Sequence, residues 1–378
     1  MRRRTFLVSV PVAVAFSGAV WHEAAASISS VSAGASPYGP LGAPDANGMA
    51  LPTGFTGRVV ARSGRLVGGT LWHPAPDGGA CFADGAGWIY VSNSEVPLIG
   101  GASAIRFRAD GSVERAYRIL SGTNINCAGG ATPWQTWLSC EEIFRGRVYE
   151  TYPLGGTTAR ARPAMGRFKH EAAACDPDHR VIYLTEDESD GCFYRFTPTT
   201  WGDLSSGRLD VLCGLGGDAV EWRQVPDPSP GVLERQTRHQ VAAARHFNGG
   251  EGCHYAAGVC YFTAKGDRRV WAYDTARQTV TAIYDGTGTL DGVDNITGRP
   301  SGDLYVAEDG GNMEINIITP DGVVAPIMRL DGHASSEITG PAFSPDGTRL
   351  YFSSQRGTSG ESAGTGGITY EVTGPFRH

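Results

Sequence analysis

A repeated segment constrains this chain more than any other feature. Six times the sequence passes from a turn into alternating apolar residues around an aromatic marker, and then into a polar or acidic end. Four of the five gaps between successive markers are 44 to 47 residues long. A period of this length, with Asp-Gly or Ser-Gly turns before β-rich runs, is typical of one four-stranded propeller blade per repeat. We therefore predict an all-β, single-domain, six-bladed β-propeller. The markers are Tyr90, Trp137, Tyr183, Tyr261, Tyr305 and Tyr351.

The remaining gap, from Tyr183 to Tyr261, is 78 residues long. It fits one blade plus an insertion of roughly thirty residues, which we place at about 201–238. This polar, turn-rich stretch is either a lid or a surface loop. Residues 27–50 are rich in Ala, Ser, Gly and Pro and predict a flexible leader, so the propeller is expected to occupy residues 51–378.

The first residues have the pattern of a targeting segment. Arg3 and Arg4 precede an apolar run from Val8 to Val20, and three alanines follow at 24–26. This pattern predicts a twin-arginine signal peptide over residues 1–26, with the twin-arginine translocase as a partner during export. A membrane anchor is the alternative, but the run is shorter than the roughly 20 apolar residues that a spanning helix needs. The expected location is periplasmic or extracellular.

The charge balance excludes one class of partner. The chain has 32 basic and 39 acidic residues and a formal net charge of −7, so electrostatics gives no case for binding nucleic acid. The eight cysteines contain no paired CxxC motif, and their pairing stays open. Four of them recur at similar places in the repeat, where small buried apolar side chains are common: Cys81, Cys127, Cys175 and Cys253.

One acidic residue stands 10 to 14 residues before each of the last four tyrosine markers. In a propeller this place is the start of the innermost strand, where the chains converge around a central channel. Carboxylates crowded there repel one another, and hard cations such as calcium or ferric iron are the simplest compensation. Alternatively, each acid points outward or pairs with a basic residue. The four are Glu171, Glu251, Asp294 and Glu337.

A second acidic set follows the markers, where the next strand is expected to end. Solvated turn acids are the stronger interpretation for this set. Cys140 differs, because a thiolate beside carboxylates would be an unusual iron-type ligand. The set consists of Cys140-Glu141-Glu142, Glu186-Asp187-Glu188 and Glu308-Asp309.

Several motifs together resemble one family. The segments at 124–134 (NINCAGGATPW) and 136–142 (TWLSCEE) closely resemble the PhoX-type alkaline phosphatases and their uncharacterised relatives. The segments GRFKHEAAA, YLTEDESDGCFYRF and EITGPAFSPDG are similar to that family in the same order, as are the EG pair at Glu251 and the DN pair at Asp294. The resemblance covers nearly the whole chain after the signal.

The resemblance implies a central cofactor of two ferric ions and calcium ions that hydrolyses phosphate monoesters. It implies that Cys140 is the cysteine ligand of iron and that Glu171, Glu251 and Glu337 are acidic ligands. It also points to Asp294 and to Glu308 or Asp309. Through their metal ligation, Cys140, Glu171 and Glu251 would be the catalytic residues. The full set expected to bind metal is Cys140, Glu141, Glu171, Glu251, Asp294, Glu308 and Glu337.

One position departs from the family pattern. Two residues before Glu251 the family's phosphatases carry an arginine that grips the substrate phosphate, whereas this chain has Gly249. An arginine would supply a bidentate clamp that glycine cannot replace. Nearby candidates for a substitute are Arg245, Lys169 and His170.

The leading hypothesis is an exported, metal-dependent phosphoric monoester hydrolase that acts as a monomer on a small phosphomonoester. One rival is a non-catalytic propeller, stabilised by calcium, that binds a ligand or a component of the cell envelope. Another is a lactonase-type propeller hydrolase with one divalent ion. Metal content, a ferric–thiolate colour and activity on a generic phosphomonoester distinguish the three.

Overall fold

The computed structural model describes residues 31–361 and 364–378. The predicted signal peptide, residues 1–26, lies outside the described residues. Within them the chain is built from β-strands, without an α-helix and with three 3-10 helices. The 3-10 helices are η1 (Pro163–Met165), η2 (Thr237–His239) and η3 (Gly357–Ser359).

The strands form antiparallel groups in chain order, which we number as sheet groups 1 to 6. Sheet group 1 consists of β6 (Pro76–Asp84), β7 (Gly87–Ser94), β8 (Gly100–Phe107) and β9 (Val113–Thr123). Sheet group 2 consists of β10 (Asn126–Ala131), β11 (Trp137–Glu141), β12 (Val148–Thr151) and β13 (Arg160–Ala161).

The next two groups are joined into one ten-stranded sheet. Sheet group 3 consists of β14 (His170–Asp176), β15 (Val181–Glu186), β16 (Gly191–Thr200), β17 (Asp203–Gly216) and a fifth strand, β18 (Ala219–Gln224). Sheet group 4 consists of β20 (Gly250–Ala256), β21 (Val259–Ala264), β22 (Arg269–Asp274) and β23 (Thr279–Tyr284). A single pair, Ala219 with Thr279, joins β18 to β23.

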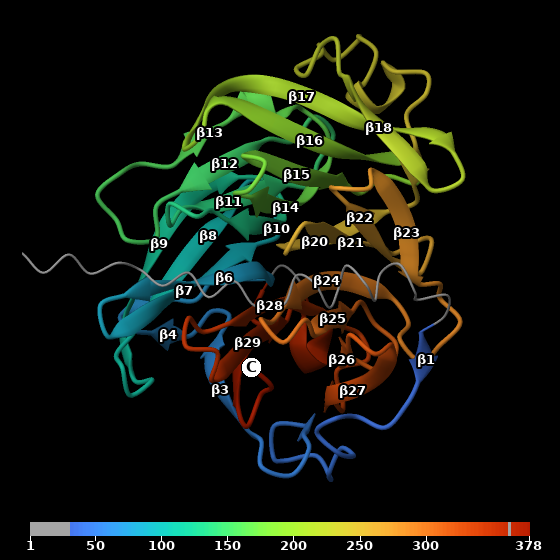
Figure 1. Ribbon diagram of the computed structural model, residues 1–378. Helices are drawn as coiled ribbons and strands as arrows, with labels where there is room; N and C mark the ends of the chain where they lie inside the picture. The colour runs from blue at the N-terminus through green and yellow to red at the C-terminus, as the bar shows by residue number, and fades with distance from the viewer. Residues whose placement is uncertain (1–30, 362–363) are drawn as a thin grey trace, which may run out of the picture.

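The last two groups come from the C-terminal part of the chain, and the sixth also includes an early strand. Sheet group 5 consists of β24 (Val293–Gly298), β25 (Leu304–Glu308), β26 (Glu314–Ile318) and β27 (Val323–Leu330). In sheet group 6, β28 (Ile338–Phe343), β29 (Arg349–Ser354) and β30 (Ile368–Thr373) are followed by the early strand β3 (Thr56–Arg62). Figure 1 shows β3 beside these C-terminal strands. This pairing ties the beginning of the fold to its end.

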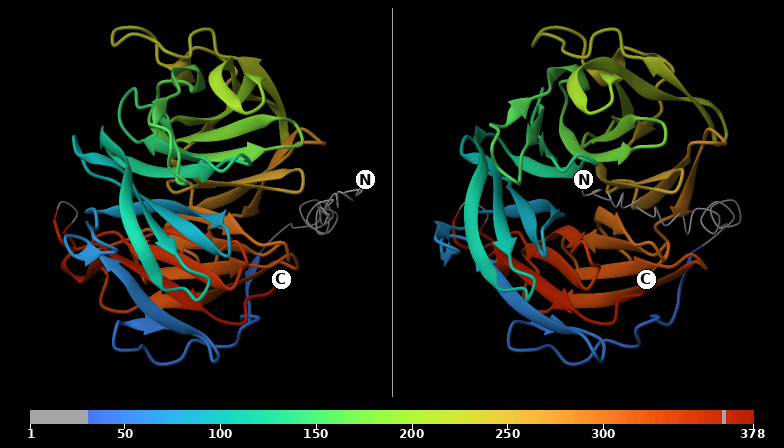
Figure 2. Two further views of the ribbon diagram at one scale, coloured as in Figure 1. Left: turned by 90° about the vertical axis from the view of Figure 1, so that its left-hand side faces the viewer. Right: turned by 60° about the vertical axis from the view of Figure 1, so that its left-hand side comes forward.

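The first strand of each group lies at the centre of the molecule. These inner strands contact one another in chain order, and β28 contacts β6, so that they close a ring. Figures 1 and 2 show the groups arranged around this centre. The fold is therefore all-β and propeller-like, as the repeat predicted. The inner strands are β6, β10, β14, β20, β24 and β28.

The aromatic markers explain why the repeat is visible in the sequence. All six lie in the second strand of their group and are at most 2 % exposed. Several contact aromatic rings of a neighbouring group, for example Tyr90 with Tyr351 at 4.9 Å between ring centroids. Burial of one large aromatic side chain between two sheets stabilises the fold by on the order of 3 kcal/mol. Each repeat thus needs one marker to fill the space between groups.

Two predicted boundaries look different in the structure. Within the predicted flexible leader, β1 (Ser32–Ala33) and β2 (Met49–Ala50) both pair with β27, so this segment is attached to sheet group 5. Within the predicted insertion 201–238, β17 is the fourth strand of its group. The additional chain is β18 together with residues 225–249, which include η2 and the short strand β19 (His246–Phe247).

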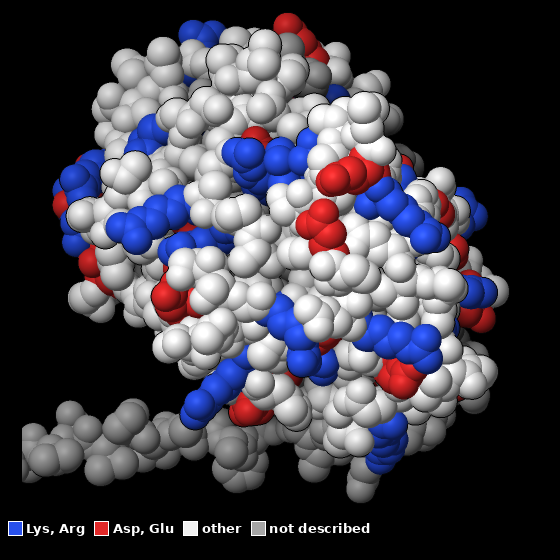
Figure 3. All heavy atoms as spheres, turned by 90° about the horizontal axis from the view of Figure 1, so that it is seen from above, with Lys and Arg blue, Asp and Glu red and all other residues white. Residues whose placement is uncertain are grey.

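The surface carries charges of both signs. On the face shown in Figure 3, Lys and Arg side chains are interspersed with Asp and Glu. Among residues 31–361 and 364–378, no helix is long and apolar enough to cross a membrane.

Candidate metal centre

An irregularity recurs near the start of every inner strand. In each one, the register shifts so that three residue steps of the inner strand match two steps of its neighbour. Such a β-bulge bends the strand and redirects a side chain. In five of the six strands, a residue with metal-binding chemistry comes first in the bulge. We call these residues the first ring: Asp77, Cys127, Glu171, Glu251 and Asp294.

A second ring lies directly after the second strand of each group. One residue follows the last residue of β7, β11, β15, β21, β25 and β29. Four of the six are acidic, and the other two are a lysine and a glutamine. The second ring consists of Glu95, Glu142, Asp187, Lys265, Asp309 and Gln355.

The two rings meet in overlapping triads. In each triad, one ligand atom per residue lies within 4.8 Å of the other two. Three triads join neighbouring groups, and the fourth lies within the first ring. The triads are Asp77-Glu95-Cys127, Cys127-Glu142-Glu171, Glu171-Glu251-Asp294 and Asp294-Asp309-Glu337.

Glu171 stands at the junction of two triads. It is fully buried, and neither carboxylate oxygen has a hydrogen-bond partner among the described residues. Burying a carboxylate without a partner costs several kcal/mol or forces its protonation. A cation bound between Glu171 and its neighbours would remove this cost. The unpaired oxygens are therefore evidence, independent of the clustering, that the centre binds a ligand.

Crowding and burial change the acidity of these groups. Burial raises the pKa of Asp77 to about 6, that of Glu142 to about 7 and that of Glu251 to about 8. For Glu171 and Asp294, burial together with the charge of Glu251 raises the pKa well above its usual range. Without bound cations, the centre thus holds protons at pH values where exposed carboxyl groups have lost theirs.

Three basic side chains border the carboxylates. The Lys169 ammonium lies 2.8 Å from Glu142 and 2.8 Å from Asp187. The Lys265 ammonium lies 2.9 Å from Glu251 and 3.2 Å from Asp309.

The third basic side chain is Arg356, whose guanidinium lies 2.8 Å from Glu337 and also donates to the amide oxygen of Gln355. Its side chain and that of Lys169 are 28 % and 29 % exposed. Positive charge can therefore meet a ligand that enters from solvent.

The structure puts a different cysteine among the carboxylates than the one expected. Cys140 is fully buried in an apolar cluster with Leu138, Val148 and Met165, and burial raises the pKa of its thiol. The expectation that Cys140 is a metal ligand does not fit this position. Cys127 instead belongs to two triads. It lies one strand earlier, in the bulge of β10.

Two of the expected acidic ligands also face elsewhere. Glu141 accepts hydrogen bonds from the backbone of Asn124 and Arg147. Glu308 accepts from the backbone of Asp291 and Glu314. Neither belongs to a triad, so both stabilise turns. In each case the next residue along the chain, Glu142 or Asp309, belongs to a triad.

The remaining expected residues converge on the centre: Glu171, Glu251, Asp294 and Glu337. Sequence reasoning missed Asp77 and Glu95. It interpreted Cys127 as a small buried side chain and Glu142 as a solvated turn acid, and it left Asp309 as an alternative to Glu308. The sequence does contain a feature that marks Asp77 and Cys127. Each is followed by Gly or Ala, as Glu171 and Glu251 are. A small residue is required here because inner strands approach closely: a Cβ on Gly78 would lie 2.5 Å from Ala128.

Gly249 lies at the edge of the centre. Its φ is +68°, and a Cβ there would lie 3.2 Å from a carboxylate oxygen of Asp187. This backbone conformation favours glycine over arginine. Of the proposed substitutes, only Lys169 borders the triads. Arg245 lies over the rings of Phe247 and Trp271.

The third proposed substitute, His170, is fully buried and its ring nitrogen is 3.1 Å from the carbonyl of Gly166. Its other ring nitrogen, Nδ1, has no hydrogen-bond partner among the described residues, and His170 belongs to none of the triads.

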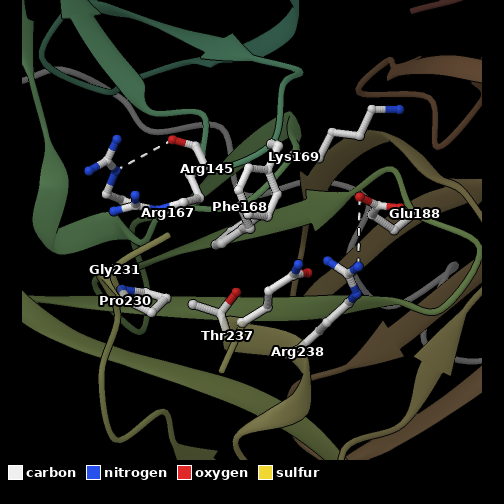
Figure 4. A pocket seen from close by; sticks show the side chains of 11 residues that line it. Arg145, Arg167, Phe168, Lys169, Glu188, Pro230, Gly231, Thr237 and Arg238 are labelled. Atoms are coloured by element: carbon white, nitrogen blue, oxygen red, sulfur yellow. Dashed lines mark hydrogen bonds and ion pairs between the residues drawn. The ribbon is translucent and has the colours of Figure 1, made fainter. Parts of the chain in front are cut away.

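A small pocket lies beside Lys169, where the chain between β18 and β19 meets the segment before β14 (Figure 4). Its volume is about 10 Å³, room for about one water molecule. Arg238 fixes this chain segment through Glu186 at 3.1 Å and Asp190 at 2.9 Å. Residues of the predicted insertion thus form part of the rim around the centre.

A family profile and two solved structures resemble this chain. A family profile described as "Alkaline phosphatase PhoX" matches residues 90–158 and 148–282, which together span about half of the chain. Among solved structures, PhoX of Pseudomonas fluorescens in complex with vanadate, a transition-state analogue, matches with a TM-score of 0.71 and 18 % identity. The match covers 91 % of this chain and 98 % of that one.

A protein of unknown function from Bacteroides thetaiotaomicron matches with a TM-score of 0.52 and 12 % identity, over 84 % of this chain and 76 % of that one. No curated protein matches. At these identities the structural matches establish the fold, and the profile establishes the family. The chain therefore belongs to the alkaline phosphatase PhoX family and is an enzyme of the phosphatase class.

Proposed function

We propose that this protein is an exported phosphoric monoester hydrolase whose two rings hold iron and calcium ions at the axis of a six-bladed propeller. The closed circuit of six inner strands supports the blade number. One observation carries the proposal: a thiol and carboxylates converge in four overlapping triads, and the buried carboxylate at their junction has no hydrogen-bond partner.

The donor set fits such a cofactor. Carboxylate oxygens suit hard cations such as calcium and ferric iron, and a thiolate suits iron. Cys127 and Glu171, which share a triad with Glu142, are the best candidates to hold iron. Burial and the charge of Asp77 raise the pKa of the Cys127 thiol. A metal ion is what would keep this sulfur as a thiolate.

When bound, the metal ions would neutralise phosphoryl oxygens and stabilise the charge that develops during transfer. The side chains of this chain would orient the substrate around them. Lys169 and Arg356 are partly exposed beside the triads and would contact the phosphoryl oxygens, in the role that the family pattern gives to an arginine at position 249. The narrow, buried setting of the first ring would exclude bulk water from the carboxylates.

Export and domain limits complete the proposal. The twin-arginine pattern supports a signal peptide over residues 1–26 and a periplasmic or extracellular location. We assign the propeller to residues 51–378, with residues 31–50 attached to it through β27. The substrate would be a small phosphomonoester, and a single chain contains the whole centre.

Metal analysis of natively exported protein tests the proposal, together with Cys127→Ala and Cys140→Ala as a matched pair. We expect iron and calcium in the wild type and in Cys140→Ala. Cys127→Ala should lose iron, any thiolate-to-iron colour and at least about 100-fold of its activity on a phosphomonoester. A wild type with calcium alone, together with an unchanged Cys127→Ala, would refute the iron centre.

A further inference from the structure

Lys265 is the one basic residue of the second ring. It directly follows β21 in sheet group 4, as Glu95, Glu142 and Asp309 follow the second strands of their own groups. Each of those three acids belongs to a triad that reaches into the next group. The first-ring residues that would complete the same triad around Lys265 are both present, as Glu251 and Asp294.

The positively charged Lys265 ammonium lies in the position that an acidic ligand has in the equivalent triads. This ammonium lies 2.9 Å from Glu251 and 3.2 Å from Asp309 of the next group. Asp294, the first-ring residue of the next group, also attracts this ammonium. An ammonium therefore stands among carboxylates in the position where the equivalent triads present an acidic ligand.

The net charge of the centre shows the effect of a lysine, in place of an acid, at position 265. A glutamate in place of Lys265 would remove one positive charge and add one negative charge. One divalent cation brings the two positive charges that would restore the balance. A lysine in the second ring and a divalent ion beside an acid are thus electrostatically equivalent.

We infer that Lys265 is a built-in cation that takes the place of one divalent metal ion between sheet groups 4 and 5. This inference rests on the proposed metal centre and concerns the number of ions that the centre binds. The chain then needs one cation fewer than a centre with an acid at this position. Lys169 has no such role, because it precedes β14 and occupies neither ring.

The test is metal stoichiometry in Lys265→Glu. Purified holoprotein, loaded with graded calcium, is measured by elemental analysis. We expect Lys265→Glu to gain about one divalent ion per chain over the wild type. Arg268→Glu is the matched control: it makes the same charge change three residues away, where the ion pair of Arg268 among the described residues is with the exposed Asp291. Its metal content should equal that of the wild type.

Lys265→Met gives a second measurement if the glutamate variant does not fold. Loss of the ammonium leaves Glu251 and Asp294 dependent on a bound ion. Chelation should therefore lower the Tm of Lys265→Met more than that of the wild type. An equal shift would contradict the inference, as would an unchanged ion count in a folded Lys265→Glu.

Kinetics distinguish the other role that a lysine could have here. If Lys265 binds the substrate phosphate, Lys265→Met raises KM while ion content and chelation shift stay those of the wild type, and the inference fails. If the wild type itself carries no metal ions, the proposed function fails instead. The two failures are therefore separate results.

Discussion

The two ends of the inner strands differ although the same six strands build both. Near their starts, the strands carry the first ring and close on buried carboxylates. Towards their ends, they surround an opening of about 370 Å³ with no acidic residue in its lining. Small residues contribute much of that lining, among them Gly79, Gly129, Ala174, Cys175, Cys253 and Gly298.

The bulges explain why the candidate ligands gather at one end of the inner strands. Beyond each bulge the inner strand returns to regular pairing with its neighbour. Between the two ends lies a space of about 40 Å³, bordered by the small residue that follows each of several first-ring residues, such as Gly78 and Ala128. One extra residue per strand is enough to bring ligand side chains together at one end.

Removal of the metal ions should have the largest effect, because it leaves the carboxylates at the starts of the inner strands without compensation. Asp77, Glu142 and Glu251 have pKa values raised to about 6, 7 and 8 in the metal-free fold. The stability that protonation of such groups provides is lost as the pH rises through these values. Metal-free protein should therefore melt lower at pH 8 than at pH 5, by on the order of 5 °C.

The metal-loaded protein should behave differently, because protons compete with metal ions for the same carboxylates. Its Tm should be highest near neutral or alkaline pH. Thermal melts of both forms across pH 5–8 measure this contrast. A metal-free form that is more stable at pH 8 than at pH 5 would show that the triads are not crowded in solution.

Arg356→Met tests whether a basic side chain beside the first ring binds the substrate. Loss of the guanidinium would remove the proposed phosphate contact without removing a triad residue, so we expect KM for a phosphomonoester to rise about tenfold. Steady-state kinetics with metal analysis make the measurement. Arg356→Lys should recover part of the loss. A normal KM in the methionine variant would exclude Arg356 from substrate binding.

The smallest effect is expected at the wide end. Cys175 lines the opening there, so Cys175→Ala should change activity by less than about twofold and cost at most about 1 kcal/mol of stability. Metal content should stay that of the wild type. Comparison with Cys127→Ala contrasts one residue type at the two ends. A large loss of activity in Cys175→Ala would mean that the wide end takes part in the reaction.

Much of the fold could be predicted because each repeat must bury one aromatic ring between neighbouring groups. The four acids before the last markers could be predicted for a similar reason, since equal distances from a buried marker imply equivalent places. The pairs Glu141-Glu142 and Glu308-Asp309 were harder. Neighbouring residues in a strand face opposite ways, so the choice between two adjacent acids depends on where the strand ends.

The amino-acid sequence was enough to predict the all-β repeat, the resemblance to PhoX phosphatases and the convergence of Glu171, Glu251, Asp294 and Glu337. That Cys127 lies among these acids, and that Cys140 lies in the apolar core, became visible in the folded chain. So did the position of Lys265 in a ring of acids. A β-bulge is a property of two paired strands, and its effect on the direction of a side chain appears once the register of both strands is known.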